Sequence, residues 1–340
     1  MEITNASYIS EIGDQTGIGG ARRTALELAA SQGFDETAAG KLAIAVTEAS
    51  ANVLKHAQRG QILLRAVGAG IEMIAIDKGA GIANVEDALI DGRSSAGTAG
   101  IGLGAIARLA SFFDIYTSES GTALLAHIFP SEQRRQLDRS EPSTLEIGAV
   151  QSVYPGETMC GDGWAQRRSR LFMVDGLGHG FHAARAAGTA IESFEHNWLR
   201  PGREIIESVH LALRSTRGAA VATLELDSEK GVAQFCGVGN IAGTVIAGET
   251  RRGMMSHNGT AGHEVHQIAA LDYPWPPGAL LIMHTDGISS KWDLNAYEGL
   301  AERHPGLIAA VLYRDFRRQR DDATVVVVRA CRNAFEGGRS

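Results

Sequence analysis

The sequence predicts a protein of two α+β domains, and three observations lead to that prediction. The chain has 340 residues, of which 44% are hydrophobic, which suits two globular domains. A polar, charged segment at 131–143 has no apolar face and is predicted to be a linker. Segments with helical and strand patterns lie on both sides of it. We therefore expect domains at 1–130 and 144–332.

The first domain begins with two predicted helices and continues mainly with strands. In the second helix, Leu42, Val46 and Val53 recur at helical spacing and indicate one apolar face. The expected elements are helices at 19–33 and 35–57, strands at 60–67 and 71–77, a helix at 103–113, and strands at 113–118 and 122–129. This is the order of an α+β sandwich.

The second domain places strands before and after a pair of helices. The expected elements are strands at 145–154 and 170–176, helices at 182–199 and 203–215, strands at 218–227, 232–239, 242–248 and 279–287, a helix near 305–317, and a strand at 323–330. Such an order predicts sheets that are packed between helical layers.

Composition excludes several function classes. The net charge of −7, without a long Lys/Arg-rich face, argues against binding to nucleic acid or to anionic membranes. The three cysteines show no C-x-x-C pair, so neither a disulfide framework nor a zinc knuckle is indicated. The N-terminus lacks a signal-peptide pattern, and no apolar run is long enough to span a bilayer. We therefore expect a cytoplasmic protein whose partners are proteins or small molecules.

A first group of polar residues and glycines suggests a nucleotide site in the N-terminal domain. Glu48, Asn52 and His56 are spaced by four residues, so they project from one face of one helix. Asp77 ends an apolar strand in "DKGAGI", and the glycine-rich "GTAGIGLG" runs into a helix, where backbone N–H groups suit a triphosphate. Each feature alone is more often a solvated helix face or a turn, but their order and spacing together are more specific.

These motifs resemble the GHKL (Bergerat-fold) ATP-binding domains. The resemblance is to the RsbT-like serine kinases of bacterial stress signalling, and it covers residues 8–129. It implies bound ATP and Mg²⁺, with Glu48 as the general base that accepts the proton of a protein serine hydroxyl. The other implied roles are Asn52 on Mg²⁺, Asp77 on the adenine amino group, Gly79 and Gly81 beneath the base, and Gly100, Gly102 and Gly104 at the phosphates.

A second group consists of aspartates at the ends of apolar strands in the C-terminal domain. Asp175 follows "RLFMV", Asp286 follows "LLIMHT", and Asp162 lies in "CGDGW". Asp321 and Asp322 precede "ATVVVVRA". Asp-Gly pairs usually mark turns. The repeated context before Asp175 and Asp286 favours instead one shared site for a hard divalent cation, which prefers oxygen ligands.

The motifs "CGDG", "VDGLGHG", "GVGN", "HNGTAG", "HTDGI" and "DDAT" resemble the SpoIIE/RsbX branch of the PPM serine/threonine phosphatases, from about residue 145 to 330. The resemblance implies a pair of Mn²⁺ or Mg²⁺ ions bridged by Asp175 and an activated water that attacks phosphorus. The resemblance also implies that Asp162 assists through metal-bound waters and that Gly176 supplies a carbonyl ligand. It further implies that Asp286 and Asp321 bind the second ion, and the choice between Asp321 and Asp322 is left open.

Three neighbours of these acids are not expected to act chemically. His179 and His182 stand at a helix start, where a cap or surface role is commoner than ligation of an oxygen-preferring ion. Cys160 is expected to be a packed thiol rather than a nucleophile. Thr285 occupies a position where serine is commoner in the family.

Together the resemblances imply a GHKL (Bergerat) α/β sandwich followed by a PPM-type α-β-β-α sandwich. The function they imply is a bifunctional bacterial regulator, an ATP-dependent serine kinase or switch joined to a metal-dependent phosphatase that acts on STAS-domain partners. In an alternative, the first domain is a non-catalytic, nucleotide-regulated module that binds a partner such as a sigma factor or a downstream phosphatase, and only the second domain is an enzyme. A sensor histidine kinase remnant is disfavoured, because no histidine-bearing helix pair precedes the ATP site.

Overall fold

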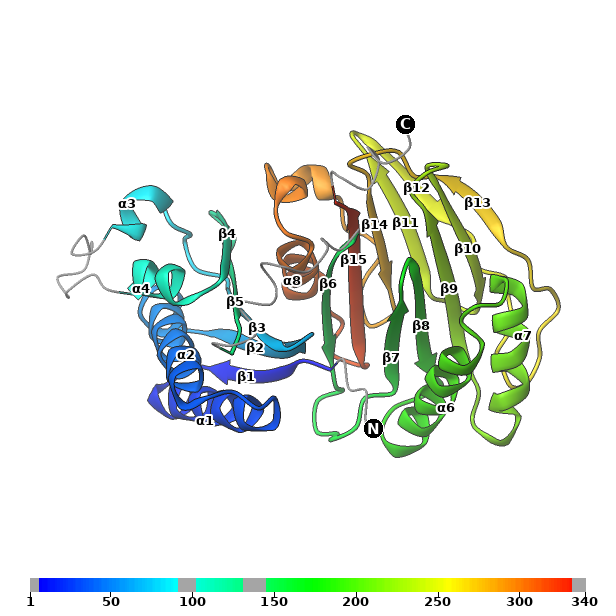
Figure 1. Ribbon diagram of the computed structural model, residues 1–340, viewed down its shortest axis with the longest axis horizontal. Coiled ribbons are helices and arrows are strands. Elements are labelled where there is room, and N and C mark those ends of the chain that lie inside the picture. Colours follow the sequence, from blue (N-terminus) through cyan, green and yellow to red (C-terminus); the bar gives the residue numbers. More distant parts are fainter. Residues whose placement is uncertain (1–5, 91–101, 131–144, 332–340) are drawn as a thin grey trace. The chain divides into compact units, whose positions relative to one another are not determined.

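A computed structural model describes residues 6–90, 102–130 and 145–331, and it divides into two compact units. Of the described residues, the N-terminal unit comprises 7–90, 102–130 and 302–314, and the C-terminal unit comprises residue 6, 145–301 and 315–331. The predicted linker at 131–143 lies outside the described residues. Each unit has sheets of its own (Figure 1). Each also has its own hydrophobic core.

The N-terminal unit contains one antiparallel sheet, and its two long helices pack on one face of that sheet. The strand order is β1-β2-β3-β5-β4. The strands are β1 (Tyr8–Ile12), β2 (Gly60–Val67), β3 (Gly70–Asp77), β4 (Phe112–Ser118) and β5 (Gly121–Ile128). The helices are α1 (Gln15–Ser31), α2 (Glu36–Ala57), α3 (Val85–Leu89) and α4 (Gly102–Leu109). Apolar side chains of α1, α2 and the sheet form one buried cluster, as the helical periodicity predicts.

Capping residues fix the ends of the two long helices. Asp14 accepts hydrogen bonds from the backbone N–H groups of Thr16 and Gly17, so α1 begins four residues before its predicted start. Asp35 caps α2 in the same way, and Gln58 ends that helix in a left-handed conformation. The predicted helix at 103–113 was too long. It ends at Leu109, because the chain then pairs with β5 as strand β4.

Most of helix α8 (Pro305–Phe316) belongs to the N-terminal unit although the helix lies late in the sequence. Just before it, the backbone N–H of His304 donates to the Asp114 carboxylate at 2.9 Å. Near its end, the Arg314 guanidinium donates to the backbone carbonyl of Asp77 at 3.1 Å. The last two residues of the helix, Asp315 and Phe316, are assigned to the C-terminal unit.

The C-terminal unit is a sandwich of two five-stranded antiparallel sheets. The sheet orders are β13-β10-β9-β8-β7 and β12-β11-β14-β15-β6. The strands of the first are β7 (Asp162–Arg167), β8 (Arg170–Gly176), β9 (Ala219–Asp227), β10 (Val232–Val238) and β13 (Leu271–Pro274). Those of the second are β6 (Leu145–Ser152), β11 (Ala242–Ala247), β12 (Thr250–Met254), β14 (Leu280–His284) and β15 (Ala323–Ala330).

Two cores hold this unit together. One lies between the sheets and joins apolar residues of β6, β8, β9, β14 and β15. The other joins β8 and β9 to helices α6 (Phe181–Asn197) and α7 (Gly202–Ala212). Short 3₁₀ helices follow at Leu213–Ser215, Leu294–Ala296 and Leu300–Glu302. Of the helices in the described ranges, none has the length and apolarity that a bilayer crossing requires.

Candidate functional site

The first two acids of the C-terminal site come from neighbouring strands of one sheet. Asp162 begins β7 and Asp175 stands near the end of β8, and the strand register makes them direct cross-strand partners. Side chains of such partners lie on the same face of a sheet. Asp162 is only 4% exposed. The side-chain hydroxyl of Thr285, on the other sheet, donates to Asp162 Oδ2 at 2.7 Å. This hydrogen bond therefore links the two sheets at Asp162.

The remaining acids belong to the second sheet, where β14 pairs with β15. Asp286 follows the end of β14, and its Oδ2 accepts a hydrogen bond from Asn240 Nδ2 at 2.7 Å. Asp321 and Asp322 directly precede β15. Because β14 and β15 are antiparallel, the end of one lies beside the start of the other. The structure thus brings the predicted acids of both sheets to one region.

Asp321 and Asp322 have different surroundings. Both carboxylate oxygens of Asp322 accept backbone hydrogen bonds, one from Tyr154 N at 2.7 Å and one from Gly161 N at 2.8 Å. Asp322 therefore fastens the segment before β7 to the start of β15. Asp321 instead lines a cavity together with Asp286. This difference favours Asp321 over Asp322 as a ligand.

Burial and mutual repulsion disfavour the charged forms of these acids. Burial, followed by the negative charges of Asp286, Asp321 and Asp322, raises the pKa of Asp175 to about 8. Burial and the charge of Asp175 raise the pKa of Asp162 well above its ordinary value. Burial and Asp286 raise the pKa of Asp321. Burial and the neighbouring carboxylates are therefore the main causes of these raised pKa values.

This donor set fits a hard divalent cation in its chemistry, because it consists of carboxylate and carbonyl oxygens, and the carboxylates repel one another when ionised. Within the described part of the chain, however, no group of three or more His, Cys, Asp or Glu side chains could hold an ion as it stands. The assignment of Asp162, Asp175, Gly176, Asp286 and Asp321 to metals stays a prediction.

The neighbouring residues have structural contacts of their own. Burial, with the charges of Asp162 and Asp322, raises the pKa of the Cys160 thiol, which disfavours the reactive thiolate. His179 Nδ1 lies 2.9 Å from Glu157 Oε1, and its ring stacks on Tyr154. An added β-carbon at Gly176 would collide with the backbone oxygen of Ala183, so only glycine allows α6 to approach β8 this closely.

Three predicted residues of the nucleotide site come together in the N-terminal unit. Glu48 and Asn52 lie on α2, and Gly102 begins α4. A β-carbon added at Gly102 would lie 3.1 Å from Asn52 Oδ1 and 3.5 Å from Glu48 Oε2. The start of the glycine-rich helix therefore meets the polar face of α2. Gly104 is buried in α4, and Gly100 lies outside the described residues.

The second part of this site surrounds Asp77 at the end of β3. Its Oδ1 accepts hydrogen bonds from Gly79 N at 2.8 Å and from Thr122 N at 3.2 Å. Gly81 has a φ of 75°, which favours glycine, and an added β-carbon there would collide with the carbonyl oxygen of Ser118. The turn "DKGAGI" thus needs glycine for its backbone path, as the sequence indicated.

Two polar neighbours of these sites were missed by sequence reasoning. The Thr117 hydroxyl accepts a hydrogen bond from Ile82 N at 2.8 Å and lies 3.1 Å from the Thr122 hydroxyl, on the strand pair beside Asp77. The sequence marks Thr285 only as a departure from serine and does not indicate its hydrogen bond to Asp162. Neither contact has a sequence signal, because both join segments that are distant in the chain.

Comparison with known proteins assigns both parts of the chain. Residues 14–128 match the family described as the histidine kinase-like ATPase domain, and residues 165–330 match the family of stage II sporulation protein E (SpoIIE). The N-terminal part of the chain belongs to the first of these families. The whole chain is a kinase-like ATPase domain fused to a PPM-type phosphatase domain.

Relatives exist for each domain. Over 99 residues the chain is 30% identical to the serine/threonine-protein kinase RsbT of Bacillus subtilis strain 168, and the match covers 28% of this chain and 74% of RsbT. A chain solved in work on the bacterial stressosome, a modular system adapted to control secondary messenger signalling, is 29% identical with a TM-score of 0.51, covering 54% of this chain and 99% of that one. RsbX in complex with magnesium is 21% identical with a TM-score of 0.50, covering 56% and 98%, and this likeness shows the fold.

Proposed function

We propose that this chain is a bifunctional signalling regulator. Its phosphatase domain removes phosphate from serine or threonine of a STAS-domain partner with the help of Mn²⁺ or Mg²⁺, and its ATPase domain phosphorylates such a partner. The observation that supports the phosphatase best is the gathering of Asp162 and Asp175 from one sheet with Asp286 and Asp321 from the other.

The residues have distinct proposed roles. Asp175, Asp286 and Asp321, with the carbonyl of Gly176, hold the metal ions. Divalent ions supply the activation of water and the neutralisation of phosphate charge in such hydrolysis. Asp162 is oriented by the hydroxyl of Thr285 at 2.7 Å, and it assists the reaction through metal-bound water.

The phosphatase is tested by phosphate release from a phosphoserine-containing STAS protein of the same cell, with and without Mn²⁺. We expect metal-dependent turnover that falls by at least about a hundredfold in Asp175→Asn, as for loss of a main electrostatic contributor. Asp272→Asn is the matched control, because Asp272 is an exposed residue of the edge strand β13. Equal turnover in wild type and Asp175→Asn would refute the proposal.

For the ATPase domain, we propose that Glu48 accepts the serine proton, Asn52 binds Mg²⁺, and Asp77 binds the adenine amino group. Support comes from the meeting of Gly102 with Asn52 and Glu48, and from the similarity to the kinase RsbT. Phosphate transfer from ATP to the STAS protein is measured best in the Asp175→Asn background, where the phosphatase cannot remove the product. Glu48→Ala should abolish transfer and keep ATP binding.

One observation favours the alternative role of the ATPase domain as a binding module. Two large apolar side chains on its helical layer are exposed, Leu26 at 39% on α1 and Ile44 at 51% on α2. Exposed apolar side chains of this kind can mark a protein-binding surface. If the transfer assay stays negative while Ile44→Glu abolishes capture of a sigma factor or another partner, the binding role is the correct one.

A further inference from the structure

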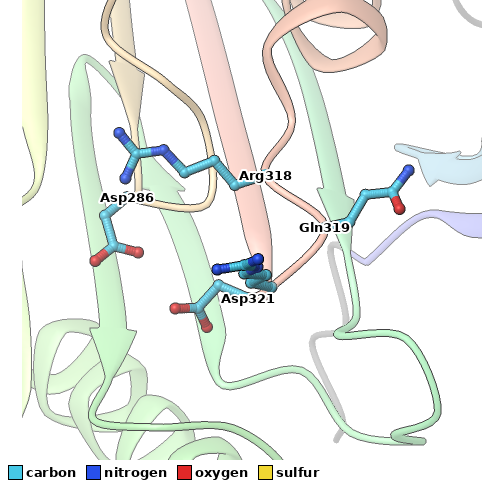
Figure 2. A pocket seen from close by; sticks show the side chains of 5 residues that line it. Asp286, Arg318, Gln319 and Asp321 are labelled. Atoms are coloured by element: carbon cyan, nitrogen blue, oxygen red, sulfur yellow. The ribbon is translucent and has the colours of Figure 1, made fainter.

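A cavity of about 450 Å³ lies beside the phosphatase acids and carries positive charge as well as negative. Its lining residues are Asp286, Arg318, Gln319, Arg320 and Asp321. Figure 2 shows the guanidinium of Arg318 on the same side of its loop as the carboxylates of Asp286 and Asp321, whereas Gln319 points away from them. A basic side chain thus shares one cavity with two of the acids.

The backbone of Arg318 is held firmly next to Asp286. The N–H of Arg318 donates to the carbonyl of Gly287, the residue after Asp286, at 2.7 Å. A second backbone bond, from Ser289 N to Phe316 O at 2.9 Å, ties the same two segments together. Because these bonds fix the loop, the position of Arg318 relative to the acids is set by the fold rather than by a free surface segment.

The side chain of Arg318 is available for a ligand. The guanidinium of its neighbour Arg317 donates to the carbonyl of Val153 at 3.1 Å and so has a structural use. Arg318 is exposed, and its guanidinium has no hydrogen bond or ion pair to any other residue in the described ranges. A fixed cation at the rim of an acidic site can therefore bind an anion that enters the cavity.

We propose that Arg318 binds the phosphoryl group of the substrate, which rests on the phosphatase function proposed above. A phosphate monoester carries a charge of about −1.5 to −2 at neutral pH, and the clustered aspartates alone would repel it. The planar guanidinium of arginine presents paired N–H donors that match two phosphate oxygens. Arg318 holds the phosphoryl oxygens that face away from the acids and so orients the phosphorus toward them.

Steady-state kinetics with Mn²⁺ test this role. The substrates are a phosphoserine STAS protein and p-nitrophenyl phosphate, which shares only the phosphoryl group. We expect Arg318→Ala to raise KM by about 10- to 100-fold for both substrates, the range for loss of a charged hydrogen-bonded contact. Arg318→Lys should lie between wild type and Arg318→Ala, because it keeps the charge without the paired donors. Unchanged KM for p-nitrophenyl phosphate would overturn the proposal.

A binding measurement separates this role from a structural one. In the presence of Mn²⁺, inorganic phosphate should raise the melting temperature of the wild type and of the control Arg252→Ala, an exposed arginine on β12. Arg318→Ala should lose the phosphate-induced rise and keep the rise caused by Mn²⁺ alone. If Arg318→Ala also lost the Mn²⁺ effect, Arg318 would support the acids structurally and the proposal would be wrong.

The binding measurement also separates failure of this inference from failure of the proposed phosphatase. If the wild type binds inorganic phosphate through Arg318 but hydrolyses neither substrate, the Arg318 site stands and the hydrolytic function fails. If the wild type hydrolyses both substrates and Arg318→Ala behaves like it in both assays, only the Arg318 inference fails. If the wild type neither binds phosphate nor hydrolyses either substrate, both fail.

Discussion

Asp162 and Asp175 face each other as cross-strand partners on β7 and β8, and the charge of Asp175 contributes to the raised pKa of Asp162. Two neighbouring carboxylates that are shielded from water cannot both ionise without a cost unless a cation balances them. Repulsion between the two carboxylates therefore lowers the stability of the folded domain by an amount that depends on pH and on bound cations. This relationship leads to the first prediction.

Without metal, the phosphatase domain should lose stability as pH rises. The pKa of Asp175 is 3.8 in an unfolded chain and about 8 in the fold, so the fold retains a proton that the unfolded chain releases. That contribution is complete below about pH 4 and is lost as pH rises toward 8. In EDTA the melting temperature should fall from pH 6 to pH 8.5. All four tryptophans lie in this domain, so their fluorescence reports it.

The variant Asp175→Asn is the control for this trend, because its side chain does not titrate. We expect its melting temperature in EDTA to change less with pH than that of the wild type, and saturating Mn²⁺ should abolish the fall in the wild type. An identical pH trend in wild type and Asp175→Asn would show that other groups cause it.

The hydroxyl of Thr285 should be required for activity, because it donates to Asp162 Oδ2 at 2.7 Å and accepts from Thr324 N at 3.0 Å. Thr285→Val removes both hydrogen bonds with little change in volume. We expect it to lower kcat by about tenfold or more, as loss of a bond to a charged group would. Thr285→Ser keeps the hydroxyl and should retain most of the activity. Equal loss in both variants would contradict the prediction, because Thr285→Ser retains the hydroxyl.

A buried ion pair should stabilise the ATPase domain at neutral pH. Burial alone would raise the pKa of Glu72, but Arg65, whose guanidinium lies 2.8 Å from it, and His127 outweigh burial and lower the pKa from 4.5 to about 2. This difference corresponds to about 3 kcal/mol, present above the unfolded pKa of 4.5 and lost as pH falls toward 2. Glu72→Gln should destabilise the domain by about 3 kcal/mol or more at pH 7.

Calorimetry of the full chain can measure this effect, since the transition that ATP shifts belongs to the ATPase domain. The loss caused by Glu72→Gln should shrink as pH falls from 6 to 3.5. Glu119→Gln, which alters an exposed residue between β4 and β5, should change little at any pH. A loss for Glu72→Gln that does not depend on pH would contradict the assigned pKa.

ATP binding should depend on Asp77 more than on the α2 residue Glu48. Asp77 Oδ1 accepts from Gly79 N and Thr122 N, so Asp77→Asn would disturb the turn as well as the carboxylate. We expect ATP affinity to fall by at least about tenfold in Asp77→Asn, a loss of about 1.4 kcal/mol. Titration calorimetry with Mg²⁺-ATP measures it. Glu48→Ala with a comparable loss of affinity would argue against its role as a base that acts only in transfer.

Sequence periodicity predicted most of the elements but not all of their ends. The strand at 60–67 and the helix at 35–57 agree with β2 and α2 within a residue, because a strong apolar pattern and an Asp cap define them. Strand β7, which carries Asp162, was not predicted. Its six residues include one glycine and three polar or charged side chains, and only pairing with β8 makes it a strand.

The sequence indicates which residues belong to the candidate sites, but it does not indicate which contacts those residues make. Local motifs indicated Asp175 and Asp286, since each follows an apolar strand. The clamp from Asp322 to Tyr154 and Gly161 spans more than 160 residues of sequence, so no local pattern reports it. Arg318 belongs to no motif, and its place beside Asp286 depends on backbone bonds that only the fold provides.

The most direct test of the central claim is a crystal of the full chain grown with Mn²⁺ and measured at the manganese absorption edge. The account predicts anomalous peaks within coordination distance of the carboxylates of Asp175 and Asp286, about 2.0–2.3 Å for oxygen on such an ion. It also predicts that these peaks disappear in Asp175→Asn. Metal-dependent turnover with no peak at these aspartates, or with manganese bound elsewhere in the chain, would contradict it.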